Sequence, residues 1–477
     1  SGRPEAATAS TSTPTSDSTS TPAPAPADAS ALASWWQGFN DPQLSALVTQ
    51  ALQANTGLRS AQAALLQARA LRDVRAAAFG PKLAASGSVQ RSGSGTVDAS
   101  NSFQAGLDAS WEVDVFGANA YADQAAVADV LAAQDNQAAV RVSLAAEVAA
   151  AYIDLRALQA RLALAQGSVA AQQETLQITR WRVQAGLASS LDQEQGVTAS
   201  EQTGAQIPAL QSSVAQSLNA LAVLTGQAPG TLGAALAATQ PVPLPPAPWA
   251  VALPADTLRQ RPDVRAAENR IAAALARAKQ ADAQRQPSFR ISGSLGLRAL
   301  TLGALTGGNA ALGSLLASVS LPVLDGGAAQ AQVRAQEAAL VQARVAYEAA
   351  VLTALKDVED VLASLQGNRD RLARLQAAVA AATNADLLAR HRYEGGLIDY
   401  RFVLDAQRTL LSTQDSLTLT RAALSADHVR LYKALGGGWV PEGGLAGLAA
   451  AAPCTPSSTY ADRHCDEPRP RHPACPR

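Results

Sequence analysis

The 477-residue chain contains no methionine, and its three cysteines, Cys454, Cys465 and Cys475, all lie close to the C-terminus. The rest of the chain therefore offers no thiolate metal ligands and no disulfides. Aromatic residues make up only 4%, and 38 basic residues balance 39 acidic ones, which gives no basic surface for nucleic acid. The sequence has no uninterrupted run of eighteen apolar residues, so we expect no transmembrane helix.

Catalytic and cofactor sites are also missing from the sequence pattern. His391 and His428 each stand alone, without a neighbouring acid and nucleophile that would make a catalytic group. No glycine-rich loop has the spacing that binds phosphate. We therefore expect neither an enzyme nor a bound cofactor.

Both ends of the chain are predicted to be disordered. Residues 1–34 are rich in Ser, Thr, Ala and Pro, as in a solvated linker. They lack the apolar core of a signal peptide, so either none exists or it has been removed before Ser1. Residues 437–477 form the predicted tail. Its cysteines, with His464 and His472, fit no common zinc spacing, so we favour disorder over a metal site.

The remaining chain is a tandem duplication. The segment "RWRVQAGL" (180–187) matches "RHRYEGGL" (390–397), and the residues before the first strand of each half also match. Such internal repetition predicts two copies of one structural unit. We assign two repeats and a proline-rich connector between them, at 35–226, 254–436 and 227–253.

Each repeat has the pattern of two strands, one very long helix and one returning helix. The strands are predicted near 82–91, 102–115, 288–299 and 314–323. The long helices, which contain no proline and carry apolar residues every seven positions, are predicted at 117–184 and 327–394. The returning helices are predicted at 190–226 and 400–435. At 1.5 Å per residue each long helix would be about 100 Å long.

In the strands, apolar or small residues alternate with mostly polar ones, most regularly from Phe103 to Val115. About 13 residues at 3.3 Å each, tilted by about 45°, rise roughly 30 Å, which is the thickness of bilayer hydrocarbon. We expect a lipid-facing set comprising Phe103, Leu107, Trp111, Val113, Phe289, Ile291, Leu295, Leu297, Val319 and Leu321. The lumen-facing charges would be Asp108, Glu112, Asp114, Arg290 and Arg298.

Four strands cannot close a barrel, and an open edge in lipid would leave backbone groups unpaired. Three copies would supply twelve strands around a water-filled lumen. The predicted fold is therefore helical with membrane β-structure. It is a trimeric 12-stranded β-barrel, continued by a long coiled-coil α-helical barrel.

Five segments in this order resemble the TolC-like outer membrane efflux factors. They are "WWQGFNDPQLSALV" (35–48), "WEVDVFG" (111–117), "RPDVRAAE" (261–268), "LPVLDGG" (321–327) and "RYEGGL…VLDAQRTLL" (392–411). The first is typical of the NodT-type lipoprotein branch. This branch begins at a lipidated cysteine, which here would have to precede Ser1.

The resemblance implies a homotrimer in the outer membrane of a Gram-negative cell, with the helical part in the periplasm. Its partners would be a periplasmic adaptor and an inner-membrane pump, and its function the efflux of drugs, toxic compounds or metal ions. The exit channel of a type I protein secretion system is the alternative within this class. A soluble coiled-coil scaffold is the alternative outside it.

The resemblance also implies two functional sites. The reversal turns would form tips that dock the adaptor, at Arg182, Gly186, Leu187, Ser190, Arg392, Gly396 and Leu397. The local interpretation is that Gly186, Gly395 and Gly396 only permit positive φ at a helix end. A periplasmic gate would be formed by Asp405 with Arg401. Its local alternative is an Arg401–Asp405 pair spaced i,i+4 near a helix N-terminus.

Overall fold

The computed structural model describes residues 32–95, 97–244, 260–306 and 311–439. All of these belong to the compact unit Ser1–Trp439, and a second unit comprises Val440–Arg477. The predicted disordered segments, 1–34 and 437–477, lie almost wholly outside the described residues. At the inner edge of the predicted tail, however, Gly437 and Gly438 are buried, and the Gly438 N–H donates to the Leu32 carbonyl at 2.8 Å. The tail was therefore predicted to begin too early.

Four antiparallel strands form one sheet in the order β1-β2-β3-β4. They span Lys82–Ser94 (β1), Val97–Val113 (β2), Ser288–Ala299 (β3) and Ala311–Ser320 (β4). Each predicted strand overlaps an observed one; β3 has the predicted bounds, and β1, β2 and β4 have shifted ends. Pro322 follows β4 and has no N–H to donate to a ladder, so β4 ends before it.

Two unbroken helices follow the sheet, α4 (Ala118–Gln184) and α9 (Ala328–Glu394), each of 67 residues. They agree with the predicted long helices to within one residue. Each begins after a glycine in the left-handed region, Gly117 at φ 78° and Gly327 at φ 85°. Side chains other than glycine rarely adopt this conformation, so the pair turns the chain sharply from strand to helix.

The returning segments differ between the repeats. In the second repeat α10 (Tyr400–Ala434) is continuous, as predicted. In the first, two helices, α5 (Ser190–Gly204) and α6 (Gln206–Leu224), replace the single predicted helix. Pro208 explains the break, because it has no N–H to donate to the Gly204 carbonyl one turn earlier.

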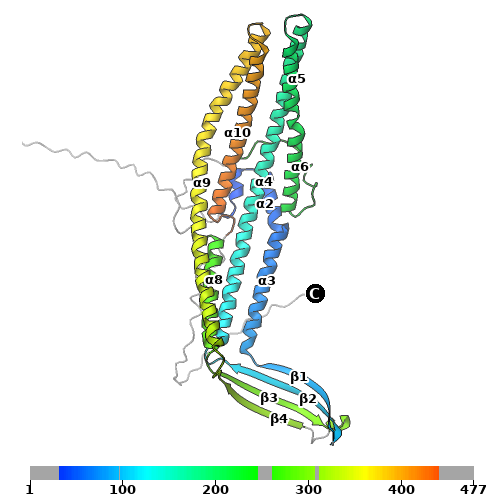
Figure 1. The fold of residues 1–477 in the computed structure, drawn as a ribbon, viewed down its shortest axis with the longest axis vertical. Helices are drawn as coiled ribbons and strands as arrows, with labels where there is room; N and C mark the ends of the chain where they lie inside the picture. The colour runs from blue at the N-terminus through cyan, green and yellow to red at the C-terminus, as the bar shows by residue number, and fades with distance from the viewer. Residues whose placement is uncertain (1–31, 96, 245–259, 307–310, 440–477) are drawn as a thin grey trace, which may run out of the picture. The chain divides into compact units, whose positions relative to one another are not determined.

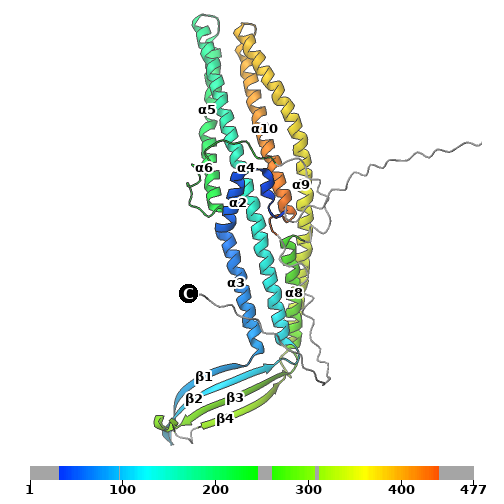
Figure 2. The ribbon, with the colours of Figure 1, turned by 180° about the vertical axis from the view of Figure 1, so that it is seen from behind.

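Shorter helices complete each repeat: η1 (Trp35–Phe39), α2 (Pro42–Ala54), α3 (Thr56–Ala76), η2 (Ala77–Phe79), α8 (Pro262–Ala283) and η3 (Leu302–Thr306). α2 begins at Pro42 because the Asp41 carboxylate accepts hydrogen bonds from the Gln43 and Leu44 N–H groups. α4 packs against α3, α8, α6, α5 and α10, and α9 packs against α8 and α10 (Figures 1 and 2).

The main core lies around the middle of α4. Trp35, Trp36 and Phe39 of η1 are buried there, and the Trp35 ring stacks on Tyr432 of α10 at 5.2 Å. Heptad positions Val148 and Leu155 of α4 are fully buried in the same cluster. The predicted heptad face is therefore a packing face, and it fixes the two repeats to each other.

The residues that follow α6 are attached to this core by hydrogen bonds, of which the first come from a buried arginine. Arg156 of α4 has no exposed surface, and its guanidinium donates to the Ala238 carbonyl at 2.7 Å and to the Gln43 side chain. Gln159 donates to the Leu236 carbonyl at 2.8 Å. From α10, Ser425 donates to the Pro243 carbonyl at 2.6 Å. The described part of the predicted connector thus bridges α4 and α10.

Candidate channel surfaces

The register of the sheet places the predicted lipid-facing residues on one face. In an antiparallel sheet, residues directly opposite each other share a face. Leu107, in β2, lies opposite Ala85 of β1 and Leu295 of β3. Along the same face Trp111 lies opposite Ile291. Leu321 is the exception, because it lies beyond the last residue of β4.

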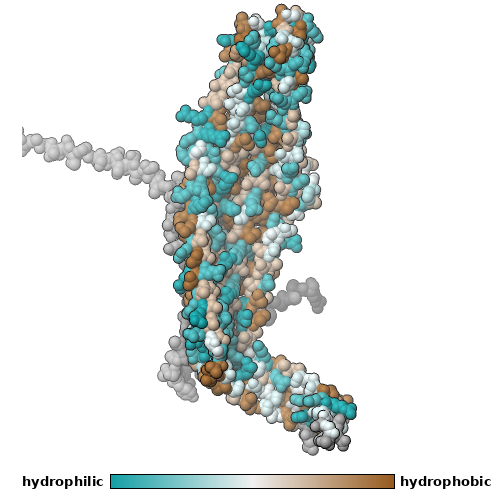
Figure 3. Space-filling model, in the orientation of Figure 1, coloured by the Kyte–Doolittle hydropathy of each residue, from teal (hydrophilic) through white to brown (hydrophobic). Residues whose placement is uncertain are grey.

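This apolar face has no covering layer among the described residues. Leu295 is 67% exposed, Val319 64% and Leu107 47%. Figure 3 likewise shows brown apolar side chains exposed on the sheet and along the helices. A sheet face of this kind is a surface for lipid or for a partner.

Aromatic side chains mark the end of the sheet nearest the helices. The Trp111 indole N–H donates to the Phe79 carbonyl at 2.9 Å, and the rings of Phe116 and Phe289 lie 6.4 Å apart. Amphipathic aromatic rings of this kind mark the two borders of membrane β-barrels.

The opposite face is polar and internally hydrogen-bonded. Ser86 donates to the Asp108 carboxylate at 2.8 Å, and Arg290 lies 3.2 Å from the Glu112 carboxylate. Arg298 is also on this face, since its partner on β2 is Gln104. The predicted lumen-facing charges therefore lie together, with one correction. Asp114 lies beyond β2, and its carboxylate accepts the Ala120 N–H at 2.8 Å at the start of α4.

The two reversal turns have the same backbone. Gly186 and Gly396 both have φ 72°, and the N–H of the following residue, Leu187 or Leu397, donates to a carbonyl five positions earlier at 2.7 or 2.8 Å. These are Schellman helix ends. The local interpretation, glycine that permits positive φ at a helix end, holds for Gly186 and Gly396 but not for Gly395, which has φ −75°.

The tips expose large apolar side chains. Leu187 is 70% exposed, Leu397 76% and Trp181 60%. Ser190, predicted as a tip residue, is the first residue of α5. Its neighbour Ser189 caps that helix in a reciprocal arrangement with Asp192. The apolar tips are suited to contact a partner.

Arg182 connects the two tips. Its guanidinium donates to the Tyr393 carbonyl and lies over the Tyr393 ring at 4.5 Å. The Tyr393 hydroxyl in turn lies 3.0 Å from the Thr179 hydroxyl. In the structure Arg182 holds the second tip against the first, and its contact with an adaptor stays a prediction. Arg392 is exposed.

A buried tyrosine lies just below the tips. Tyr400 is 1% exposed and its ring lies 5.2 Å from that of Tyr393. Burial raises the pKa of its phenol to about 12. On α5, Gly196 faces Tyr400 so closely that a Cβ there would lie 2.7 Å from the tyrosine hydroxyl oxygen. Sequence reasoning missed Tyr393, Tyr400 and Gly196, because their proximity arises only in the folded pair of helices.

The predicted gate residues do not pair with each other. Asp405 is largely exposed and its nearest cation is Arg408 at 3.9 Å. Arg401 lies 3.5 Å from Asp399, and its guanidinium lies over the Phe402 ring at 4.9 Å. The local alternative, an Arg401–Asp405 pair within one chain, is therefore not formed. Asp405 remains an exposed carboxylate near the start of α10.

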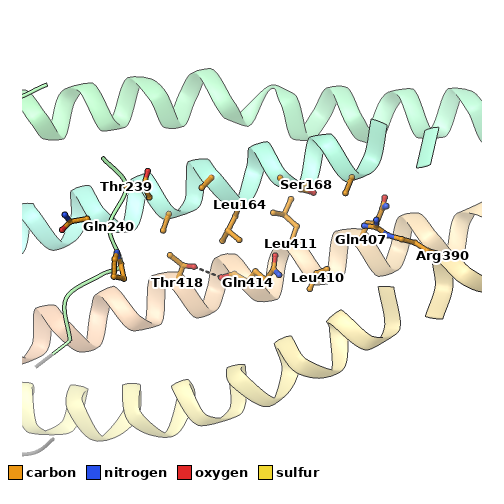
Figure 4. Close-up of a pocket in the computed structure, with 15 residues that line it drawn as sticks. Leu164, Ser168, Thr239, Gln240, Arg390, Gln407, Leu410, Leu411, Gln414 and Thr418 are labelled. Atoms are coloured by element: carbon orange, nitrogen blue, oxygen red, sulfur yellow. Dashed lines mark hydrogen bonds between the residues drawn. The ribbon is translucent and has the colours of Figure 1, made fainter. Parts of the chain in front are cut away.

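A pocket of about 540 Å³ lies between α4 and α10, along part of the length over which they run side by side (Figure 4). Gly167 and Leu164 line its wall, while Gln407 and Arg390 lie at one end. No acid, histidine or cysteine lines this pocket. Within the described residues no group of three or more His, Cys, Asp or Glu side chains could hold a metal, and the cysteines of the tail lie outside them.

His391 and His428, the two histidines singled out in the sequence, each have a polar contact on their own helix. Nδ1 of His391 lies 3.6 Å from the Glu394 carboxylate in the last turn of α9. Nδ1 of His428 lies 2.7 Å from the Leu424 carbonyl within α10, and burial lowers its pKa. The surfaces and tips, rather than any pocket, are the candidate functional parts.

Comparison with known proteins gives a consistent result. The family model "Outer membrane efflux protein" matches residues 47–227 and 253–437, that is, both repeats. The toluene efflux pump outer membrane protein TtgF of Pseudomonas putida is 31% identical over 420 residues, covering 85% of each chain. Nodulation protein T of Rhizobium leguminosarum is 30% identical over 413 residues, covering 86% of this chain and 85% of its own. The outer-membrane channel OprN has the same fold, with a TM-score of 0.81 at 32% identity, covering 86% of this chain and 93% of OprN.

Proposed function

Because this chain belongs to the outer membrane efflux protein family, we propose that it is the exit channel of a tripartite efflux system, passing small molecules from the periplasm to the outside. The observation that carries this proposal is the four-stranded sheet with one apolar and one polar face, continued by 67-residue helices. An outer membrane location with periplasmic helices follows from the family. The soluble-scaffold alternative has no support from these relatives.

We propose that the channel is a homotrimer. The sheet has two free edges, β1 and β4, and each would leave unpaired backbone groups in lipid. Pairing β1 of one copy with β4 of the next removes all edges when the ring closes. Three copies give twelve strands, which enclose a lumen wide enough for water.

Unpartnered helix faces support the same assembly. On α3, Leu66 and Val74 are 63% and 65% exposed, and on α9, Val341 and Val345 are 57% and 58% exposed. By length and composition α9 could also cross a membrane. A helix that packs its apolar face on another copy of the chain has the same apolar composition as a membrane span. We favour packing on another copy, because α9 connects the sheet to α10.

The duplication indicates which helices meet between copies. Within one chain, α4 packs against α8, with Arg277 contacting Asp129. α3 is the counterpart of α8, and α9 the counterpart of α4. The equivalent seam between copies is therefore α9 against α3, where Leu71 and Ala339 take the positions of the ion pair. At this position the seam between copies would be apolar where the seam within the chain carries an ion pair.

The partners proposed are a periplasmic adaptor and an inner-membrane pump. The two apolar tips, at Leu187 and Leu397, are the surface suited to an adaptor because they are the most distant from the sheet along the helices (Figure 1). In the trimer Asp405 would form a ring of three carboxylates near these tips. Such a ring attracts cations and narrows the periplasmic end.

Small molecules are the proposed cargo, since TtgF is named for toluene efflux. Type I protein secretion stays the alternative, and neighbouring genes for a pump and an adaptor would distinguish the two. A lipid anchor on a cysteine preceding Ser1 is a further proposal. Mass spectrometry of the protein purified from its own membranes would detect the acyl chains.

The test of the function is deletion and complementation in the native host. We expect deletion of the gene to increase intracellular toluene and dye accumulation, and the wild-type gene to restore export. The protein should fractionate with the outer membrane and migrate as a trimer before heating. Unchanged accumulation of every compound tested, together with loss of a secreted protein, would favour the secretion alternative.

A further inference from the structure

The duplication gives each contact between the two repeats a counterpart at the boundary between copies. In a closed ring, the second repeat of one chain faces the first repeat of the next, just as the first faces the second within a chain. The segments "RWRVQAGL" (180–187) and "RHRYEGGL" (390–397) align the first tip, between α4 and α5, with the second tip, between α9 and α10. A contact between the tips of one chain therefore predicts a contact between tips of neighbouring copies.

Within the chain, the first tip holds the second through side chains at three positions. The Arg182 guanidinium donates to the Tyr393 carbonyl and lies over the Tyr393 ring at 4.5 Å. The Tyr393 hydroxyl lies 3.0 Å from the Thr179 hydroxyl. The same carbonyl also accepts the Gly396 N–H at 2.9 Å. A carbonyl oxygen has two lone pairs, so it can accept the helix-end bond and the arginine together.

The acceptor and the donor of this contact both have counterparts. Val183 aligns with Tyr393, and its carbonyl accepts the Gly186 N–H at 3.0 Å in the same type of helix end. One lone pair of that oxygen is left for a second donor. Arg392 aligns with Arg182 and is exposed in the single chain. In the ring of repeats these two counterparts belong to neighbouring copies.

We propose that Arg392 binds the Val183 carbonyl of the next copy and thereby closes the ring of tips. The partner is a second copy of this chain, and the inference rests on the proposed homotrimer. A hydrogen bond from a guanidinium to a carbonyl is charge-assisted and is therefore stronger than a neutral one. Arg392 thus acts between copies, whereas the resemblance to the family assigned it to adaptor docking.

A solvated arginine, or one that contacts an adaptor, is the simpler interpretation of Arg392. The equivalent arginine argues against both, because Arg182 lies against a neighbouring tip. The backbone around the two arginines is also the same. The carbonyls of Arg182 and Arg392 accept the N–H groups of Leu187 and Leu397 at 2.7 and 2.8 Å. Equal helix ends start the two side chains in equivalent directions.

The contact between copies is weaker than the contact within the chain. Where the chain has the Tyr393 ring and the Thr179 hydroxyl, the boundary between copies has Val183 and Ala389. These side chains can form neither a cation–π contact nor a hydrogen bond. Of the contacts in this set, the duplication keeps the bond from arginine to carbonyl. Loss of Arg392 should therefore loosen the ring between copies, while the two tips of one chain stay together.

The first test is crosslinking of the purified full-length protein without an adaptor. The three cysteines of the tail are replaced by serine, which leaves a chain without cysteine. Arg392→Cys combined with Val183→Cys should then form covalent dimers and trimers with a short bismaleimide, visible on a denaturing gel. Glu394→Cys combined with Val183→Cys is the matched control. Glu394 lies two residues further along α9, about 200° around the helix, so this pair should remain largely monomeric on the gel.

The second test records single channels of the same protein in planar lipid bilayers. Arg392→Ala should raise the open fraction about tenfold or more, as expected for the loss of one charge-assisted hydrogen bond. Arg392→Lys should restore most of the wild-type behaviour, since an ammonium group also donates to a carbonyl. Crosslinking no greater than in the control pair, or an unchanged open fraction in Arg392→Ala, would overturn the contact. Wild-type protein that is monomeric in membranes would instead refute the trimeric channel.

Discussion

A methyl group added at Gly196 should push apart the helices that carry the two tips. The Cβ of Gly196→Ala would lie 2.7 Å from the Tyr400 hydroxyl oxygen and 2.9 Å from Cδ1 of Leu176. Tyr400 is 1% exposed, so its ring cannot swing into solvent without opening the cluster that it forms with Tyr393. Such overpacking costs about 1–3 kcal/mol.

The substitution also has a favourable component. Replacing glycine by alanine inside a helix contributes about 1 kcal/mol of stability. Gly196→Ala should therefore be destabilising by about 0–2 kcal/mol in each protomer. Gly167→Ala is the matched control, because nothing lies within 4 Å of a Cβ at that position. Gly167→Ala should gain only the stability that alanine adds inside a helix, and its midpoint of thermal unfolding should rise.

Tyr400→Phe supplies the rescue. The Tyr400 hydroxyl is buried and makes no well-formed hydrogen bond, with the Thr179 side chain as its weak partner, so its removal should cost little stability. In the Gly196→Ala background it also removes the clashing oxygen, and the double variant should regain most of the lost stability. The measurements are thermal unfolding by circular dichroism and leak current in bilayers. Gly196→Ala that unfolds at the same temperature as Gly167→Ala would refute the steric argument.

Three further predictions concern the membrane face, the tips and the gate. Leu107→Arg should impair outer-membrane assembly, since arginine at mid-bilayer costs about 2–4 kcal/mol, whereas Asp108→Arg should assemble; equal amounts of trimer in membrane fractions would contradict the assigned faces. Leu187→Asp combined with Leu397→Asp should abolish efflux in accumulation assays while trimers persist, and normal efflux would exclude adaptor docking at the tips. Asp405→Ala should reduce cation preference in single-channel recordings, and unaltered selectivity would leave Asp405 only its local role in α10.

The regular elements could be predicted from the sequence because each has a period. Alternation from Phe103 onwards placed β2 and its faces, and seven-residue repeats placed α4 and α9. The break before α6 has a local signal in Pro208, which the returning helix of the second repeat, 400–435, does not contain. Repeats predict similarity, and a single proline is enough to remove it locally.

The contacts between the tips could not be predicted in this way. Tyr393 and Gly196 are far apart in the sequence, and only the packing of α5 on α10 brings the second near Tyr400. The sequence paired Arg401 with Asp405, one helical turn later. In the structure Arg401 contacts Asp399 instead, the residue just before α10. Side-chain partners near a turn depend on the turn geometry, which no periodicity encodes.

The anchoring of α4 by the buried aromatic and arginine core gives that helix a fulcrum. From Val148 to the end of α4 at Gln184 the helix extends about 54 Å, at 1.5 Å per residue. A tilt of about 10° around the fulcrum would carry the tip sideways by roughly 9 Å, while the packed residues beside Arg156 move very little. A partner that pulls at the tips therefore acts on α4 with a long arm. Because α4 is unbroken from Ala118 to Gln184, the same tilt would move its sheet end in the opposite direction by roughly 8 Å.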